Sequence, residues 1–155
     1  MPTRDDAYLM MTTHVKNENL QKHMLAVEAA MRFYAPKFGE DEELWAMTGL
    51  LHDCDYEKFP DLREHTLISA GWLREGGYDE RIIYAILAHN DLNVDTHPRN
   101  NPLSHALYAC DEITGMVTAT APKTKCHSRK LSTILPELIA LFSLPPAPKE
   151  YATLG

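Results

Sequence analysis

The stretch Gly49-Leu50-Leu51-His52-Asp53-Cys54-Asp55-Tyr56-Glu57 places a histidine and an aspartate directly after an apolar run. Leu44, Met47 and Leu50 follow helical spacing, so the sequence predicts a helix that ends near His52 and Asp53. A carboxylate beside an apolar helix face is costly unless it is paired with a positive group or binds a metal ion. This stretch therefore directs attention to the other histidines and carboxylates of the chain.

Four further helices are predicted on both sides of this one. Apolar residues recur at helical spacing in each, and capping residues such as Asn17 or Asn19 and Asp79 mark the starts. Pro36 is expected to end the first helix, Gly76 closes another, and Pro102 begins the last. The expected ranges are about 17–35, 62–75, 79–89 and 102–118. No segment shows the alternation of a strand, so we expect an all-α, single-domain bundle of five core helices.

The chain has 155 residues, which is the usual size of one domain, and its 45% apolar and 24% charged residues are typical of a globular protein. We expect an N-terminal extension over 1–16, a helical domain over 17–120 and an irregular segment with a proline-rich tail over 121–155.

Charge and cysteine content exclude several classes of protein. The net charge of −7 is unlike the basic footprint of a nucleic-acid-binding protein or of a polybasic membrane anchor. No apolar run approaches the length of a transmembrane helix, and the first residues lack a signal-peptide pattern. The three cysteines share no metal-binding spacing. We therefore expect a cytoplasmic protein with no nucleic-acid or membrane partner, whose oligomeric state the sequence leaves open.

A histidine or carboxylate lies on or beside the apolar stripe of every predicted helix. These residues are His23, His52, Asp53, His65, His89 and Asp111. Taken singly, such a histidine is more often a hydrogen-bonded core residue than a metal ligand. Six of these groups converging at the bundle centre would bind a divalent cation. Imidazole and carboxylate ligands suit Fe, Mn, Co, Ni or Zn.

The order of these groups resembles the HD-domain superfamily of metal-dependent phosphohydrolases, most closely its small HD or HDIG-type hydrolases. The resemblance is carried by NLQKH at 19–23, GLLHDCDYE at 49–57, AILAH at 85–89 and LYACDEITG at 107–115. It implies that four residues bind one ion, namely His23, His52, Asp53 and Asp111. It also implies that His65 and His89 hold a second ion while Asp53 bridges the two.

The resemblance further implies hydrolysis of a small-molecule phosphate ester, such as a nucleotide or a related phosphomonoester or phosphodiester. Two other functions stay open. A di-iron oxygenase would use the same ligand order, and a non-catalytic module would bind metal or nucleotide for a partner protein.

Other charged residues are candidates for the catalytic machinery beside the ligand Asp53. Phosphoryl transfer needs cations around the phosphate oxygens, and Lys58 is the first candidate, followed by Arg63 and Arg99. Each of the three can equally be a solvated surface charge. Asp55 and Glu57 could orient the nucleophilic water or protonate the leaving group. Alternatively both are surface carboxylates, or Asp55 pairs with Lys58.

Overall fold

A computed structural model describes residues 2–120, in which six α-helices and one short 3-10 helix form the regular structure. Their bounds are α1 Arg4–His14, α2 Glu18–Phe38, α3 Glu42–Leu51, α4 Leu67–Glu75, α5 Glu80–His89, the 3-10 helix η1 Asp91–Asn93, and α6 Pro102–Thr120. No strand occurs in this part of the chain, so the predicted all-α, single-domain bundle is confirmed. The predicted irregular segment 121–155 lies outside the described residues.

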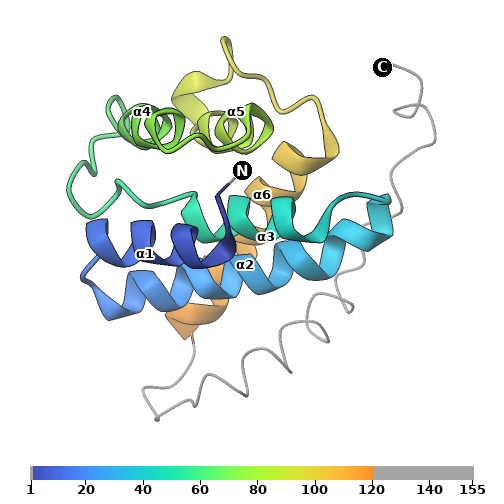
Figure 1. Ribbon diagram of the computed structural model, residues 1–155, viewed down its shortest axis with the longest axis horizontal. Coiled ribbons are helices and arrows are strands. Elements are labelled where there is room, and N and C mark those ends of the chain that lie inside the picture. Colours follow the sequence, from blue (N-terminus) through green and yellow to red (C-terminus); the bar gives the residue numbers. More distant parts are fainter. Residues whose placement is uncertain (1, 121–155) are drawn as a thin grey trace.

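Helix α3 is at the centre of the bundle and packs against α1, α2, α5 and α6. Figure 1 shows α1 and α2 in one layer with α3, and the α4–α5 pair on the other side of α3. Helix α6 crosses the two layers and contacts α2, α3 and α5. Fully buried side chains of α3, α5 and α6 fill the centre, among them Leu50, Ile86 and Leu107. Burial of each such side chain contributes roughly 1.5–3 kcal/mol.

The first sixteen residues, expected as an extension, contain helix α1. Thr3 begins this helix with a capping box, in which its side chain and that of Asp6 each accept from the other's backbone N–H. A half-buried ion pair then attaches the helix to α2, since Arg4 Nη2 donates to Glu28 Oε2 over 2.9 Å. The pair with Glu28 joins residues 24 positions apart, so local sequence could not show how this helix is attached.

Helix α2 continues through Pro36 and ends at Phe38, so the prediction that Pro36 ends this helix is wrong. A proline in the last turn removes one intrahelical hydrogen bond, because only its own backbone N–H is missing. Gly39 follows as the C-cap, and its φ of 73° is left-handed. The N–H of Glu40 then bonds the carbonyl of Ala35 over 3.0 Å, which is the usual closure after a left-handed glycine.

Helix α4 begins at Leu67, five residues later than the predicted start at 62. Residues 61–66 form turns, and Thr66 interrupts the helical path with a left-handed φ of 70°. This conformation is disfavoured for a β-branched residue. It is held by Asp55, whose Oδ2 accepts from the N–H of Thr66 over 2.8 Å. A distant carboxylate therefore sets the start of α4, which local sequence could not show.

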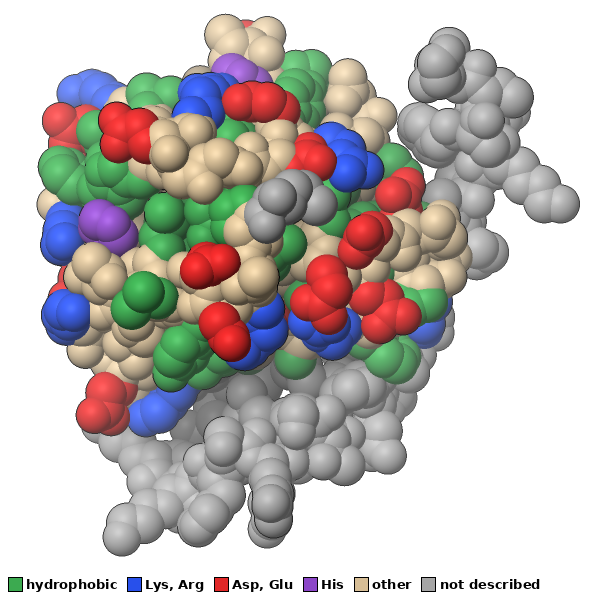
Figure 2. Space-filling view, viewed as in Figure 1, with side chains coloured by type: hydrophobic (Ala, Val, Ile, Leu, Met, Phe, Trp, Pro, Cys, Tyr) green, Lys and Arg blue, Asp and Glu red, His purple; other side chains and the backbone are tan. Residues whose placement is uncertain are grey.

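The surface of the bundle carries both signs of charge. On the face in Figure 2, acidic and basic side chains are interspersed. None of the helices in residues 2–120 combines the length and the apolar character that a bilayer span requires.

Helices α2 and α3 approach one another closely at Gly49. A Cβ atom added to Gly49 would lie 2.8 Å from the carbonyl oxygen of Val27, which is backbone and has no room to move aside. Glycine at this position therefore lets α2 and α3 pack in direct backbone contact. The contact also sets the separation between the side chains that these two helices carry toward the centre.

We expect Gly49→Ala to lower the free energy of unfolding by about 1–3 kcal/mol, because the added methyl group forces α2 and α3 apart. Gly71→Ala is the matched control, since Gly71 lies inside α4 with no atom within 4 Å of the added Cβ. This control should stabilise the protein by about 0.5–1 kcal/mol. Urea unfolding of both variants measures the difference, and equal effects would contradict the role assigned to Gly49.

Candidate metal centre

Five segments of the bundle bring their polar side chains to one place. Helices α3 and α5 end there, α2 begins there, and the α3–α4 segment and the middle of α6 complete the cluster. The ligand atoms form two groups, each with all its atoms within 4.8 Å of one another: His23, His52 and Asp111 in the first group, and Asp53, His65 and His89 in the second. The structure thus brings all six predicted ligands together.

The first group has the spacing of ligands around one ion. His23 Nε2 lies 2.9 Å from Asp111 Oδ1 and 3.3 Å from His52 Nε2. His52 Nε2 lies 3.5 Å from Asp111 Oδ1. Ligands that are about 2.0–2.2 Å from a shared ion lie roughly 3–3.6 Å from one another. The three side chains therefore fit a transition-metal ion without any change in the helices that carry them.

Asp53 lies between the two groups, with one carboxylate oxygen toward each. Its Oδ2 is 3.4 Å from His52 Nε2 and 3.9 Å from His23 Nε2. Its Oδ1 is 3.4 Å from His65 Nε2 and 3.6 Å from His89 Nε2. The side chain is 13% exposed. A single buried carboxylate thus faces imidazole nitrogens on both sides.

Two of the histidines are oriented by the ends of their own helices. His52 Nδ1 donates to the Gly49 carbonyl over 2.8 Å, and His89 Nδ1 donates to the Ile86 carbonyl over 2.7 Å. Carbonyls in the last turn of a helix have no helical partner, so they are available as acceptors. Because Nδ1 carries the proton in the neutral ring, Nε2 presents its lone pair to the centre.

His65 precedes a helix, so it has no such carbonyl, and Asp55 takes the same role. Asp55 Oδ1 accepts from His65 Nδ1 over 2.8 Å. Its Oδ2 accepts from the N–H groups of Thr66 and Ser69, both over 2.8 Å. Asp55 is fully buried, so the alternative that it is a surface carboxylate does not hold. A carboxylate behind a histidine ligand fixes the ring orientation and raises its basicity.

Asn90 is a residue of the site that sequence reasoning missed. It follows His89 and is buried, and its Nδ2 donates to the carbonyls of Leu62 and His65 over 2.7 and 3.1 Å. It therefore fastens the segment of His65 to the end of α5, where His89 lies. A polar residue next to a candidate ligand was the available signal, but its partners are more than 20 positions away.

Glu57 lies outside the six-residue cluster. Its Oε2 accepts from the backbone N–H groups of Lys16 and Asn17 over 2.7 and 2.9 Å, and these hydrogen bonds lower the pKa of its carboxyl. Glu57 thereby connects the segment after α3 to the start of α2.

The three cations predicted to contact phosphate also lie outside the cluster. Lys58 Nζ lies 3.5 Å from Nδ1 of His14, whose ring stacks on Trp72. Arg99 Nη1 donates to the Ala88 carbonyl over 2.8 Å, so this guanidinium binds the end of α5. Arg63 is exposed on the turns before α4.

Charge in the cluster is strongly coupled. Burial disfavours the charged form of His52, but Asp53 and Asp111 outweigh it and hold the pKa of His52 well above its ordinary value. Burial also works against charge on the two aspartates, yet His52 holds the pKa of both carboxyls below the usual range. A proton on His52 thus supplies positive charge that a metal ion would otherwise supply.

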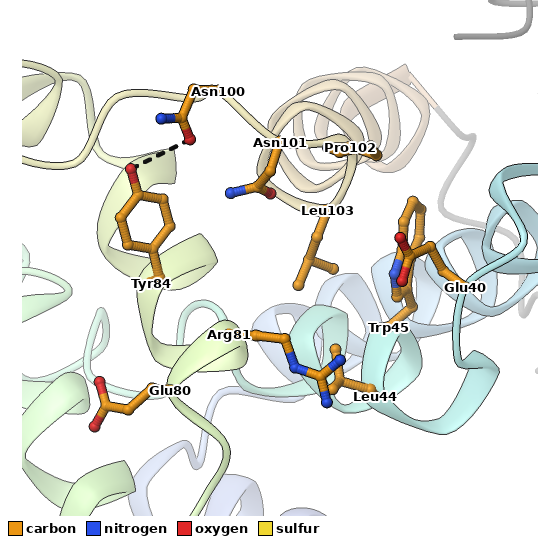
Figure 3. A pocket seen from close by; sticks show the side chains of 10 residues that line it. All are labelled: Glu40, Leu44, Trp45, Glu80, Arg81, Tyr84, Asn100, Asn101, Pro102 and Leu103. Carbon is orange, nitrogen blue, oxygen red and sulfur yellow. Dashed lines mark hydrogen bonds between the residues drawn. The ribbon is translucent and has the colours of Figure 1, made fainter. Parts of the chain in front are cut away.

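A separate pocket of about 530 Å³ opens at the other ends of α3 and α5. Figure 3 shows Leu44, Trp45 and Leu103 around it, with Arg81 and Tyr84 at its edge. None of the six clustered residues lines this pocket, because the cluster forms at the C-terminal ends of α3 and α5 and the pocket at their N-terminal ends.

A family model of the HD domain matches residues 20–116. This chain belongs to the HD domain family. The matched range runs from α2 into α6, so this HD domain includes all six clustered residues. No curated protein and no solved structure matches the chain. HD domains bind divalent metal ions, and the imidazole and carboxylate donors found here suit such an ion.

We expect Asp55→Asn to weaken metal binding by about 10- to 100-fold, the usual effect of losing a carboxylate behind a histidine ligand. The amide has one acceptor oxygen, so it cannot hold His65 and both backbone N–H groups. Asp95→Asn, at an exposed position, is the control. Titration with Mn²⁺ followed by calorimetry measures both variants, and unchanged affinity in Asp55→Asn would show that His65 needs no such support.

Metal binding should release protons and weaken as the pH falls. The raised pKa of His52 means that this imidazole is protonated below that pKa, and the ion must then displace the proton. Above that pKa the competition disappears. Calorimetric titrations in buffers with different ionisation enthalpies count the protons released. An affinity for Mn²⁺ that does not vary with pH would exclude this competition.

Proposed function

We propose that this HD domain is a metal-dependent phosphohydrolase that acts on a small phosphate ester, such as a nucleotide, and that it uses two divalent ions. The observation that carries the proposal is the placement of Asp53, whose two oxygens face the two groups separately. Two ions roughly 3.5–4 Å apart suit the attacking and leaving oxygens of a phosphoryl transfer. One carboxylate that spans two histidine-containing groups supports this arrangement.

Each clustered side chain has a role in this proposal. His23, His52 and Asp111 would hold one ion and His65 and His89 the other, with Asp53 shared. When bound, the ions supply hydroxide near neutral pH and polarise the phosphoryl group. The acceptors of Nδ1 at Gly49, Ile86 and Asp55 direct Nε2 of His52, His89 and His65 inward, where it can bind an ion once it carries no proton.

The hydrogen bonds of the nearby acids limit their part in catalysis. Asp55 accepts three hydrogen bonds within the fold, so we propose that it positions His65. Glu57 accepts hydrogen bonds from two backbone N–H groups. To act as a general acid, its carboxyl would have to break both of these bonds. Phosphate binding by Lys58, Arg63 and Arg99 stays a prediction.

Metal stoichiometry tests the two-ion proposal. We expect two ions per chain in the parent protein and one in His65→Ala and in His89→Ala, because each loses a ligand of the second group. His105→Ala, an exposed histidine on α6, should keep both ions. Elemental analysis after loading with Mn²⁺ or Fe²⁺ measures the count. One ion in the parent that persists in both variants would make this a single-ion site.

Hydrolysis is tested with a panel of phosphate esters, and Asp53→Asn should reduce turnover by at least about a hundredfold, since it removes a shared ligand. Phosphate release that is absent from the metal-loaded parent on every ester would overturn the hydrolase proposal. Consumption of oxygen by the iron-loaded protein would then indicate an oxygenase, and its absence would indicate a binding module.

A further inference from the structure

Most of the large exposed apolar side chains lie in segments next to metal ligands in the sequence. Of the seven in the described residues, two lie on α1 and five lie in the segments that carry or follow His65 and His89. These five are Tyr56, Leu62 and Leu67 before and at the start of α4, and Leu92 and Val94 after α5. Exposed apolar patches on a folded domain commonly mark a binding surface.

The two segments are joined to one another next to the metal ligands. Asn90 Nδ2 donates to the Leu62 carbonyl over 2.7 Å, and Asn93 Nδ2 donates to Thr66 Oγ1 over 3.0 Å. Leu62 precedes His65 by three positions, and Leu92 follows His89 by three. The exposed leucines are therefore held by the same hydrogen bonds that hold the second group of ligands.

Tyr56 brings an aromatic ring to the centre itself. Its ring centroid lies 5.0 Å from that of the His65 imidazole, in an edge-to-face arrangement, and the residue is 41% exposed. A molecule bound at the metal centre and extending past His65 would therefore meet the phenol ring. We call Tyr56, Leu62 and Leu92 together the apolar rim.

In residues 2–120, two of the three cations expected to contact phosphate have other partners. Lys58 contacts His14 of α1, and Arg99 is engaged by Asp91 over 2.8 Å and lies 3.9 Å over the ring of Tyr108. A substrate with one phosphate and a large apolar group would use both the ions and the exposed apolar side chains.

We propose that the apolar rim recognises an aromatic or other large apolar group on a phosphate monoester whose single phosphate binds the metal centre. The proposal rests on the proposed function and names the substrate class for that site. The phosphate would lie at the ions, and the organic group would pack against Tyr56, Leu62 and Leu92.

Phosphonates test the rim without catalysis, because their carbon–phosphorus bond is not hydrolysed. We expect the full chain loaded with Mn²⁺ to bind 1-naphthylphosphonate about tenfold more tightly than methylphosphonate, as burial of the ring adds about 1.4 kcal/mol. The metal-free protein should bind neither. Calorimetric titration gives each affinity, and equal affinity for the two phosphonates would overturn the proposal.

Variants identify the surface responsible. Leu62→Ser and Leu92→Ser, combined in one chain, should remove most of the tenfold preference while the metal content stays unchanged. Leu9→Ser is the matched control, since Leu9 is 66% exposed but lies on α1. A preference that survives in the double variant, or is lost in the control, would show that the rim does not bind the naphthyl group.

Hydrolysis separates this inference from the proposed function. Preferential binding of 1-naphthylphosphonate without turnover of any ester would support the role of the apolar rim and contradict the proposed hydrolase activity. Turnover of 1-naphthyl phosphate and methyl phosphate with equal kcat/KM, together with equal phosphonate affinities, would keep the hydrolase and overturn the rim. If the loaded protein binds neither phosphonate and hydrolyses no ester, both proposals fail.

Discussion

The buried carboxylate of Asp53 lies between two groups of imidazoles, and a buried negative charge is stable only where positive charge or hydrogen-bond donors surround it. Imidazoles surround the Asp53 carboxylate on both sides. His52 faces Oδ2, and His65 and His89 face Oδ1. The end of α3, the α3–α4 segment and the end of α5 must therefore meet at one point. Their packing and the metal chemistry depend on the same constraint.

Helix ends orient two of the histidines without additional polar side chains. A helix leaves carbonyls without partners in its last turn, and a histidine just there can donate Nδ1–H to one of them. His52 and His89 both do so, and Gly49 serves twice, since its carbonyl orients His52 while its missing side chain lets α2 approach. His65 stands before a helix, where no such carbonyl exists, and this explains why a buried Asp55 accompanies it.

The support around His65 extends to the shape of the chain. Asp55 accepts the N–H of Thr66 in a left-handed conformation, which turns the chain sharply before α4. Asn90 then binds the same turns to the end of α5. Strain of this kind persists where surrounding contacts determine the conformation. The turns that carry His65 also present Leu62 to solvent, so ligand position and exposed surface come from one set of hydrogen bonds.

The sequence by itself determined the helical class and the six ligand candidates. Apolar spacing of 3.6 residues, capping residues such as Asn17 and Asp79, and histidines next to apolar runs are local properties that a helix preserves. The same local rules misjudged Pro36, because a missing N–H in a last turn costs one hydrogen bond and Gly39 closes the helix three residues later.

Only the tertiary structure decided which partners the other charged side chains contact. Asp55 lies two positions from Asp53, yet it faces away from the shared centre toward His65 Nδ1. Lys58 lies beside His14 and Arg99 at the end of α5, where partners from other helices are available. Spacing within a helix follows from its backbone hydrogen bonds. The partner of a polar side chain outside a helix depends on which elements pack against it, and that is settled by burial of the whole core.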